Sequence, residues 1–370
     1  MRKLFISFGT RPEAIKMCPL ILELKNHSEF EVIICVTGQH KEMLSQVLET
    51  FNIVPDYDLA IMKEKQDLFD ITSNILTGVK EILQKEQPDI VLVHGDTSTT
   101  FSVALAAFYL SIPVGHVEAG LRTNNLYEPF PEEFNRRILG MISSIHFCPT
   151  ETAKQNLLSE GVSESKIFVT GNTVIDALKI TIKQDFQSTL LKSFYGSRVV
   201  LLTVHRRENQ GQPMKNIFLA IKRILQEFPD VKVVFPVHKN PQILELANQV
   251  FKGIKNIQLI EPMDVLDFHN LINNCYFIAS DSGGIQEEAP SLGKPVLVLR
   301  NTTERPEGVK AGTLKLVGTE ESRVYEEFKR LLMDDEEYKR MSQASNPYGD
   351  GFASKYISSI INAYFKGKQI

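Results

Sequence analysis

The stretch YFIASDSGGIQEEAP, at residues 276–290, sets the arrangement from which the rest of the chain can be interpreted. Its apolar start predicts a short β-strand, two adjacent glycines follow, and the next residues favour a helix that stops at Pro290. A strand, a tight turn and a helix start direct free backbone N–H groups at one point, which suits a phosphate. Gly283 and Gly284 lack a Cβ atom, so a ligand can approach the backbone closely there.

Two interpretations of this turn stay open from these residues alone. In the first, the turn binds a phosphate, and Glu288, four residues after Gly284, accepts hydrogen bonds from the hydroxyls of a ribose. In the second, Ser282 only caps the helix and Glu288 is a surface glutamate. The residues at the other strand ends bear on the choice between them.

Length and composition describe a globular protein of two domains. The 370 residues exceed one ordinary domain, and 43 % of them are hydrophobic and 23 % charged. A net charge of −4 without a basic block disfavours nucleic acid and anionic membrane as partners. The four scattered cysteines form no CxxC pair, which disfavours a zinc knuckle or disulfide framework and fits a reducing compartment. Without a signal-peptide core or a run of ~20 apolar residues, the sequence predicts a cytoplasmic location.

Short apolar runs alternate with amphipathic helical stretches along the chain. Strands are predicted in the first half at residues 4–8, 32–36, 90–93, 113–117, 145–149 and 167–170. Strands are predicted in the second half at residues 199–204, 231–237, 257–260, 276–280, 296–299 and 314–317. This repetition indicates two α/β domains with doubly wound parallel sheets of the Rossmann type. Because ligands bind at the carboxyl ends of such strands, the residues after each strand are the candidates for a site.

The alternation loosens between residues 171 and 196, where the chain becomes mixed and polar. We therefore assign residues 1–172 to an N-terminal domain, 173–195 to a hinge region and 196–352 to a C-terminal domain. Residues 353–370 predict a final helix that can pack back on the N-terminal domain. The expected architecture has the two domains facing across a deep cleft.

Acidic residues follow the strands of the first half. Asp96 comes after the strand at 90–93 and Glu118 after the strand at 113–117, so both belong to the same end of the sheet. Helix capping by Asp96 or Thr97 is the alternative for the first of these positions. A proline-rich loop then carries Glu132 and Glu133, of which at least one can face the cleft.

Basic residues mark two further strand ends. Arg11 and Lys16 follow the first strand and can hold an anionic substrate, unless they are only solvated charges beside a glycine turn. His205 and Arg206 follow the first strand of the second half, where a basic cluster suits a pyrophosphate. His238 ends the next strand, but the absence of HxH and HExxH spacing disfavours a metal site. Without a GxGxxG or GxSxG motif, acid–base chemistry is favoured over dinucleotide or nucleophilic catalysis.

Eight of these segments resemble the bacterial non-hydrolysing UDP-N-acetylglucosamine 2-epimerases, in the order that the family has them. They are GTRPEAIK (9–16), HGDT (94–97), GHVEAGLR (115–122), PEE (131–133), TGNT (170–173), HRRE (205–208), DSGGIQEEA (281–289) and TERPE (303–307). The resemblance implies a GT-B-like fold and the reversible conversion of UDP-GlcNAc to UDP-ManNAc for cell-surface polysaccharide precursors. It implies elimination of UDP to 2-acetamidoglucal and its re-addition, with no NAD or metal cofactor, and a homodimer.

The resemblance also implies roles at matching positions. Asp96, Glu118 and Glu132 match the catalytic carboxylates of the family, and His205 matches its essential histidine near the pyrophosphate. The remaining matches are substrate-binding: Arg11 and Lys16 in the active-site cleft, and Ser282, Gly283, Gly284 and Glu288 in the UDP-binding turn, with Glu288 on the ribose. The sequence does not assign one carboxylate as the base for each epimer.

Some family members are activated by a second UDP-GlcNAc beside the active site. The matching positions here are Gln39, Gln66, Glu132, Arg206 and His238. Glu42 stands where activated members carry glutamine, and Lys65 stands where they carry arginine. A carboxylate near a pyrophosphate is unfavourable and lysine lacks the bidentate fork, so we predict weak or absent activation and a hyperbolic rate curve.

Other functions compatible with these residues are a 2-epimerase of a related UDP-2-acetamido sugar, a hydrolysing epimerase and a glycosyltransferase with the same fold. A silent sugar-nucleotide-binding protein is a further alternative, which the acids at 96, 118 and 132 disfavour.

Overall fold

The computed structural model describes residues 1–38, 41–63 and 66–367, apart from the side chains of residues 41 and 42. The chain divides into two compact units, each built on its own parallel sheet. The first unit comprises Met1–Ile180 and Tyr348–Ile370, and the second comprises Thr181–Pro347. Helix α7 (Thr173–Thr181), which lies in the region assigned as a hinge, therefore belongs to the first unit up to Ile180. The chain rejoins the first unit at Tyr348, four residues before the expected limit at 352.

The sheet of the first unit has the strand order β3-β2-β1-β4-β5-β6-β7 within the described residues, and every pairing is parallel. The strands are β1 (Arg2–Phe8), β2 (Phe30–Val36), β3 (Tyr57–Asp58), β4 (Ile90–His94), β5 (Val114–Val117), β6 (Ile145–Cys148) and β7 (Ile167–Val169). β4 is buried along its whole length, as its continuous apolar sequence requires. The strand order reverses between β1 and β4. In such sheets ligands bind next to this reversal, at the carboxyl ends of the strands.

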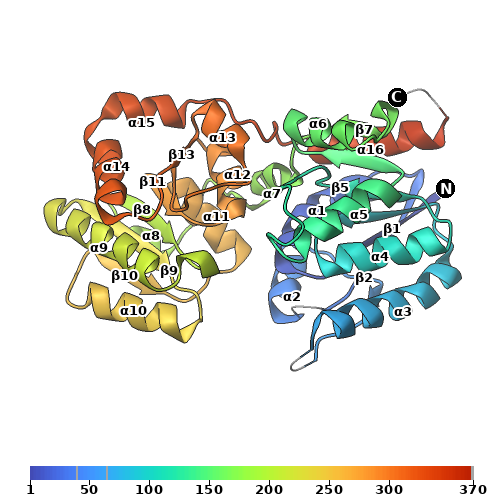
Figure 1. The fold of residues 1–370 in the computed structure, drawn as a ribbon, viewed down its shortest axis with the longest axis horizontal. Coiled ribbons are helices and arrows are strands. Elements are labelled where there is room, and N and C mark those ends of the chain that lie inside the picture. The colour runs from blue at the N-terminus through green and yellow to red at the C-terminus, as the bar shows by residue number, and fades with distance from the viewer. Residues whose placement is uncertain (39–40, 64–65, 368–370) are drawn as a thin grey trace. The chain divides into compact units, whose positions relative to one another are not determined.

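Helices of the first unit cover its sheet (Figure 1). They are α1 (Arg11–Lys25), α2 (Lys41–Thr50), α3 (Leu68–Glu86), α4 (Ser98–Tyr109), α5 (Glu132–Ile142), α6 (Glu151–Ser159), the 3-10 turn η1 (Glu164–Lys166), α7 and α16 (Ala353–Phe365). Ile75 of α3, Val103 of α4 and Leu139 of α5 pack with strand residues in one core cluster. Helix α1 packs against β1, β2 and β4, and α16 packs against α1, which places the C-terminal helix in the first unit.

The second unit repeats this plan, with the parallel strand order β10-β9-β8-β11-β12-β13 among its described residues. Its strands are β8 (Arg198–Thr203), β9 (Val231–Pro236), β10 (Ile257–Ile260), β11 (Phe277–Ser280), β12 (Val296–Val298) and β13 (Leu314–Leu316). Its helices are α8 (Thr189–Lys192), the 3-10 turn η2 (Arg207–Asn209), α9 (Gln212–Glu227), α10 (Pro241–Phe251), α11 (Val265–Asn274), α12 (Gly283–Ser291), α13 (Pro306–Ala311), α14 (Glu321–Met333) and α15 (Asp335–Ser342). Helices α9, α10 and α14 share one core cluster with the strands, whereas α11 and α12 share another.

Two features differ from the sequence-based expectations. The helix predicted to stop at Pro290 continues to Ser291. A proline this close to the helix end removes a single N–H donor, and the N–H of Leu292 then closes the end on the carbonyls of Ala289 and Pro290. The elements β3, α6, α8, α13 and α15 were not predicted, because β3 has two residues and the four helices have four to nine, too few to show a clear helical period.

Candidate active-site residues in the two units

The first group of candidates lies at the carboxyl edge of the first sheet. β4 and β5 pair in parallel with His94 opposite Val117, so the chain leaves both strands at the same edge. Asp96 follows β4 and Glu118 follows β5. The expectation that these two carboxylates belong to one end of the sheet is therefore confirmed.

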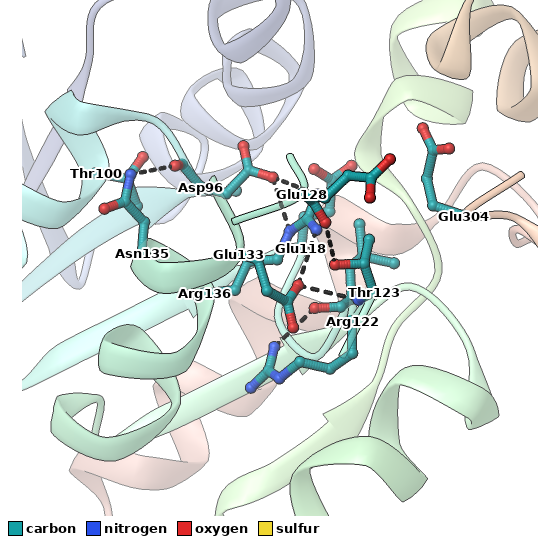
Figure 2. Close-up of polar contacts among 12 residues, drawn as sticks. Asp96, Thr100, Glu118, Arg122, Thr123, Glu128, Glu133, Asn135, Arg136 and Glu304 are labelled. Carbon is teal, nitrogen blue, oxygen red and sulfur yellow. Dashed lines mark hydrogen bonds and ion pairs between the residues drawn. The ribbon is translucent and has the colours of Figure 1, made fainter. Parts of the chain in front are cut away.

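Asp96 is held by an arginine and does not cap a helix. The N-cap of α4 is Thr97, whose Oγ1 accepts from the backbone N–H of Thr100 at 3.1 Å. Oδ2 of Asp96 instead accepts from Nε of Arg136 at 2.8 Å and lies 2.7 Å from its Nη2, as Figure 2 shows. Asn135 donates to the backbone carbonyl of Asp96 at 2.7 Å. The alternative in which Asp96 serves as a helix cap is thus wrong.

Arg136 joins the two acidic segments of the first unit. Its Nη1 donates to Oε2 of Glu133 at 3.2 Å, while the rest of the guanidinium binds Asp96. Burial would lower the pKa of Arg136, but the carboxylates of Asp96 and Glu133 outweigh burial and raise it. Arg136 is therefore a permanent cation that orients the Asp96 carboxylate.

Glu118 has an unusual backbone conformation and several polar neighbours. Its φ is +61°, in the left-handed region that side-chain-bearing residues seldom adopt and that is often found at functional sites. Its carboxylate forms an ion pair with Lys16 of α1 and accepts from Nδ2 of Asn172 at 2.8 Å. Nε2 of His94 lies 3.8 Å from its other oxygen. A Cβ atom at position 95 would lie 3.3 Å from Glu118 Oε2, so Gly95 gives this carboxylate its room.

The adjacent glutamates at the start of α5 have different environments. Glu133 is completely buried, and its carboxylate accepts from the backbone N–H of Thr123 at 3.0 Å (Figure 2). It also accepts from the backbone N–H of Asn124 at 3.2 Å. Glu133 therefore shapes the loop before α5. Oε2 of Glu132 is buried without a hydrogen-bond partner among the described residues. A buried carboxylate oxygen without a partner is costly, so Glu132 is the member of this pair whose geometry fits a ligand-facing role.

The two basic candidates of the first unit, Arg11 and Lys16, lie on α1. Arg11 is its first residue, and Lys16, one turn further on, is buried and paired with Glu118. Between them, Glu13 closes a capping box with Thr10 and also accepts from Oγ1 of Thr97 at 2.7 Å. Burial raises the pKa of Glu13, and these hydrogen bonds act against the rise. Glu13 thus ties the loop after β1 to the loop after β4.

Three buried histidines lie on the neighbouring strands β4, β5 and β6. Burial lowers the pKa of His94 to about 4, of His116 to about 3 and of His146 to about 4. All three are therefore neutral at pH 7. Nε2 of His116 lies 2.7 Å from the carbonyl of Gly95 and must carry the proton that it donates. Since His94 is neutral, the positive charge beside Glu118 comes from Lys16.

In the second unit the glycine turn leads from β11 directly into α12, which is the strand–turn–helix order predicted from the sequence. Ser282 occupies the N-cap position of α12, but its side chain makes no capping hydrogen bond. The interpretation of Ser282 as a mere cap is therefore wrong. A Cβ atom at Gly283 would lie 2.6 Å from Nη1 of Arg305 and 3.0 Å from Oε1 of Glu304. Arg305 occupies this place because its Nε donates to Oε1 of Glu287, one helical turn further along α12.

Glu288 is nearly buried on the same helix. Its Oε1 lies 3.4 Å from the position that a Cβ atom would take at Gly284, so the side chain folds back toward the turn. Its Oε2 lies 3.9 Å from Nε2 of His269, whose Nδ1 is 2.8 Å from Oγ1 of Thr181. The expectation of Glu288 as a surface glutamate is wrong, because only 9 % of the residue is exposed.

Asp281 organises the basic loop after β8. It is completely buried, and its carboxylate accepts from the backbone N–H groups of His205 and Arg206 and from Nδ2 of Asn209, at 2.9–3.1 Å. Asn209 also donates to the carbonyl of Leu299. The loop of β8 is thus fastened to the loop of β11, where the glycine turn begins.

The side chains of this basic loop are partly accessible. The ring of His205 is 41 % exposed and stacks on His238, with ring centroids 6.1 Å apart. Burial lowers the pKa of His205, and Asp281 acts in the opposite direction. Nη2 of Arg206 lies 3.7 Å from Oε1 of Glu304. Burial would raise the pKa of Glu304, but arginines 305 and 300 hold it at about 2, so Glu304 is ionised.

Of the remaining candidates, which the resemblance assigns to a second UDP-GlcNAc site, the structure describes Gln66. Gln39 and Lys65 lie outside the described residues, as does the side chain of Glu42. Gln66 accepts a hydrogen bond from the backbone N–H of Lys63 at 3.2 Å. Across residues 1–38, 41–63 and 66–367, no group of three or more His, Cys, Asp or Glu side chains is placed to hold a metal ion. In the same ranges, no helix has the length and apolar character needed to cross a membrane.

Sequence reasoning missed four residues that hold the candidates in place: Arg136, Asn172, Asp281 and Arg305. Three of them lay within the segments that carried the family resemblance, namely 170–173, 281–289 and 303–307. That signal could have directed attention to them. Arg136 lies in the middle of an amphipathic helix, and nothing in its sequence surroundings distinguishes it from a surface arginine.

Comparison with known proteins identifies the family of the chain. Residues 22–362 match the family model described as UDP-N-acetylglucosamine 2-epimerase. The protein of that name from Bacillus subtilis (strain 168) is 59 % identical over 355 residues, which cover 96 % of this chain and 93 % of the relative. The structure of UDP-GlcNAc 2-epimerase from Neisseria meningitidis bound to UDP-GlcNAc matches with a TM-score of 0.91 and 51 % identity, over 97 % of this chain and 99 % of that one.

A co-structure of S. aureus MnaA with UDP matches with a TM-score of 0.93 and 50 % identity, over 99 % of this chain and 97 % of that one. These relatives share the fold over nearly the full length of both chains, and the family model covers both units. The chain is therefore an isomerase that belongs to the UDP-N-acetylglucosamine 2-epimerase family.

Proposed function

We propose that the protein interconverts UDP-GlcNAc and UDP-ManNAc by eliminating UDP to 2-acetamidoglucal and adding it back. The observation that carries the proposal is the pair of carboxylates at one sheet edge, Asp96 on Arg136 and Glu118 on Lys16. The relative from N. meningitidis binds UDP-GlcNAc and the one from S. aureus binds UDP, and these ligands are the substrate and the leaving group of the reaction.

The proposed reaction needs two kinds of group. A base removes the proton from C2, the electron pair of that bond forms the C1–C2 double bond, and the C1–O bond breaks with its electrons on the UDP oxygen. For the return, UDP oxygen re-adds at C1 and an acid delivers a proton to the opposite face of C2. We assign the proton transfers to Asp96, Glu118 and Glu132, without naming the base for each epimer.

We assign the nucleotide to the second unit. The N-terminal end of α12, with Ser282, Gly283 and Gly284, directs backbone N–H groups at an anion. Glu288 suits the ribose hydroxyls as a hydrogen-bond acceptor, and His205 suits the pyrophosphate as a donor. As UDP leaves, its oxygens gain negative charge, which the helix end and the basic loop can stabilise.

The decisive experiment is incubation with UDP-GlcNAc in heavy water, followed by NMR of the sugar. We expect UDP-ManNAc to appear and deuterium to enter C2 of both epimers. Epimerisation without deuterium at C2 would refute the elimination route, and unchanged UDP-GlcNAc would refute the proposed activity. Parallel incubations with other UDP-2-acetamido sugars test for a sibling substrate, and free UDP released in step with ManNAc would indicate a hydrolysing enzyme instead.

We further propose that the enzyme is a cytoplasmic homodimer that supplies precursors of cell-surface polysaccharides. The four cysteines are buried free thiols, which fits a reducing compartment. Light scattering after size-exclusion chromatography tests the dimer, for which a mass twice that of the 41.9 kDa chain is expected.

A further inference from the structure

The proposed chemistry assigns no role to Asn172, which lies in the segment 170–173. It lies between β7 and α7 and only 3 % of it is exposed. Its Nδ2 donates to Oε1 of Glu118 at 2.8 Å, and its Oδ1 accepts from the backbone N–H of Val174 at 3.0 Å. The side chain therefore contacts the start of a helix with one end and a candidate catalytic carboxylate with the other.

These two hydrogen bonds fix the orientation of the amide. If its oxygen and nitrogen exchanged places, the NH2 group would face the N–H of Val174 and the oxygen would face the Glu118 carboxylate. Both contacts would then be repulsive, so the donor end of Asn172 must point at Glu118. A planar amide with one end bound to the backbone delivers its hydrogen bond in a fixed direction.

The backbone of Asn172 is anchored as firmly as its side chain. Its N–H donates to the carbonyl of Tyr348 at 2.8 Å, at the point where the chain re-enters the first unit. A Cβ atom on Gly171 would lie 3.1 Å from Cα of Gly349, and both glycines have positive φ, +82° and +117°. The two segments touch through glycine backbones, which leaves Asn172 little freedom to move away from Glu118.

The other described neighbours of Glu118 differ from Asn172 in charge or in freedom of movement. Lys16 provides the cation from α1, on a flexible side chain whose ammonium group donates in several directions. His94 lies 3.8 Å away on β4 and is neutral at pH 7. The Asp96 carboxylate after β4 is bound by Arg136. Among these described neighbours, Asn172 is a planar donor whose direction is fixed, which suits it to set the rotation of the Glu118 carboxylate.

We propose that Asn172 is a positioning residue that holds the Glu118 carboxylate ionised and correctly rotated for proton transfer at C2. The proposal rests on the function proposed above and deepens it, because it gives one residue a part in that reaction. Asn172 does not touch the reacting atoms in this scheme, and it acts only through Glu118.

The variant Asn172→Asp tests this role with almost no change of shape. Its carboxylate can still accept from the N–H of Val174, and a negative charge is favourable at the start of α7. Toward Glu118, however, it replaces a donor by a second carboxylate, and two adjacent carboxylates resist ionising together. We expect kcat to fall roughly 10- to 100-fold, as the loss of a hydrogen bond to a charged group implies. KM should change by less than about threefold, since a positioning role acts on the transition state.

The pH profile separates positioning from a loss of stability. In Asn172→Asp the acidic limb of kcat should move to higher pH, by about one unit or more. Asn256→Asp is the matched control: its Nδ2 donates to the carbonyls of Leu225 and Val231, at the amino-terminal end of β10 in the second unit. That change should lower the midpoint of thermal unfolding and leave the acidic limb in place.

The outcomes distinguish the two proposals. If the wild-type protein does not epimerise UDP-GlcNAc, the proposed function fails. If it does, and Asn172→Asp keeps wild-type kcat and an unshifted acidic limb, the positioning role is refuted. If Asn172→Asp does not fold, Asn172→Ser decides, because serine can cap α7 but is too short to reach Glu118. A folded Asn172→Ser with wild-type kcat would then refute the role, and a reduced kcat with unchanged KM would support it.

Discussion

The substitution Asp281→Asn removes one charge from the centre of the second unit while keeping the size of the side chain. Asp281 is completely buried, and Oδ2 accepts from the backbone N–H groups of His205 and Arg206 and from Nδ2 of Asn209, at 3.0, 2.9 and 3.0 Å. An asparagine retains one acceptor oxygen, without the charge, and its NH2 group takes the place of Oδ1, where it faces the N–H of His205. The loop after β8 should therefore loosen.

The size of the effect follows from these three hydrogen bonds. A hydrogen bond to a charged group contributes about 1.5–3 kcal/mol and a neutral one about 0.5–1.5, so each bond loses about 1 kcal/mol. Burying a neutral amide costs less free energy than burying a carboxylate, and this difference offsets part of the stability lost through the weaker hydrogen bonds. We expect the free energy of unfolding of the second unit to fall by about 2 kcal/mol.

The same change should alter His205. Burial lowers the pKa of its imidazole, and the Asp281 carboxylate opposes burial. Without that carboxylate the pKa of His205 should fall further, so the ring should lose its proton at lower pH than in the wild-type protein. UDP affinity should drop by roughly tenfold, because a displacement of His205 and Arg206 that costs about 1.4 kcal/mol has that effect.

Urea unfolding followed by circular dichroism measures the stability, calorimetry measures UDP binding, and histidine NMR measures the titration of His205. Asp334→Asn is the matched control, since Asp334 caps α15 in the same unit, is 45 % exposed and accepts only from the N–H of Glu337 at 3.0 Å in the hydrogen bonds described. It should cost a few tenths of a kcal/mol, about the penalty of a weakened cap. Equal losses for the two variants, or unchanged UDP affinity in Asp281→Asn, would refute the assigned role of Asp281.

Three further substitutions test other parts of the molecule. Gly283→Ala places a Cβ atom 2.6 Å from Nη1 of Arg305, so UDP binding should weaken at least roughly tenfold in calorimetry, and wild-type affinity would contradict the crowding described here. Glu288→Gln removes the charged acceptor assigned to the ribose, so KM should rise while kcat stays within about threefold of wild type; a loss confined to kcat would reassign the residue. His146→Leu removes a buried imidazole with a pKa of about 4. When the pH falls from 7 to 5, the unfolding free energy of this variant should decrease by about 2 kcal/mol less than that of the wild-type protein.

The sign of that last effect follows from proton binding. An unfolded histidine titrates near its ordinary pKa of about 6.5, so between that pH and 4 the unfolded state binds the proton and the folded state does not. Acidification through this window therefore favours unfolding. The difference between the urea midpoints at pH 7 and pH 5 should be smaller in His146→Leu than in the wild-type protein. An equal difference in both proteins would show that His146 is not a source of the acid sensitivity.

The sheet architecture could be predicted from the sequence because its signal is spread over many residues. The strand β4 is a continuous apolar run, and its predicted range of 90–93 differs from the observed Ile90–His94 by one residue. The elements that were missed, such as α6 and α13, are short and contribute few side chains to the large core clusters. Their positions depend on contacts with distant segments, which a local pattern does not contain.

The candidate site was less predictable, because adjacent acids with equal chemistry have different partners. Glu132 and Glu133 were indistinguishable in sequence. In the structure Glu133 is completely buried and accepts hydrogen bonds from the backbone N–H groups of Thr123 and Asn124. Asp96 and Thr97 were both possible caps, and the structure assigns the cap to Thr97. Only the three-dimensional arrangement of donors separates such pairs.

The acids of this protein form two groups according to their donors, and the distinction bears on function. Glu13, Glu133 and Asp281 are buried, and each accepts from two consecutive backbone N–H groups of a loop at a sheet edge. Backbone donors cannot leave, so these carboxylates fix loop conformation. Asp96 and Glu118 are paired with the side chains of an arginine and a lysine, which can rotate as charge on the carboxylate changes. Glu133 also pairs with Arg136, but its backbone donors hold it in place, whereas the described partners of Asp96 and Glu118 are side chains that can move during proton transfer.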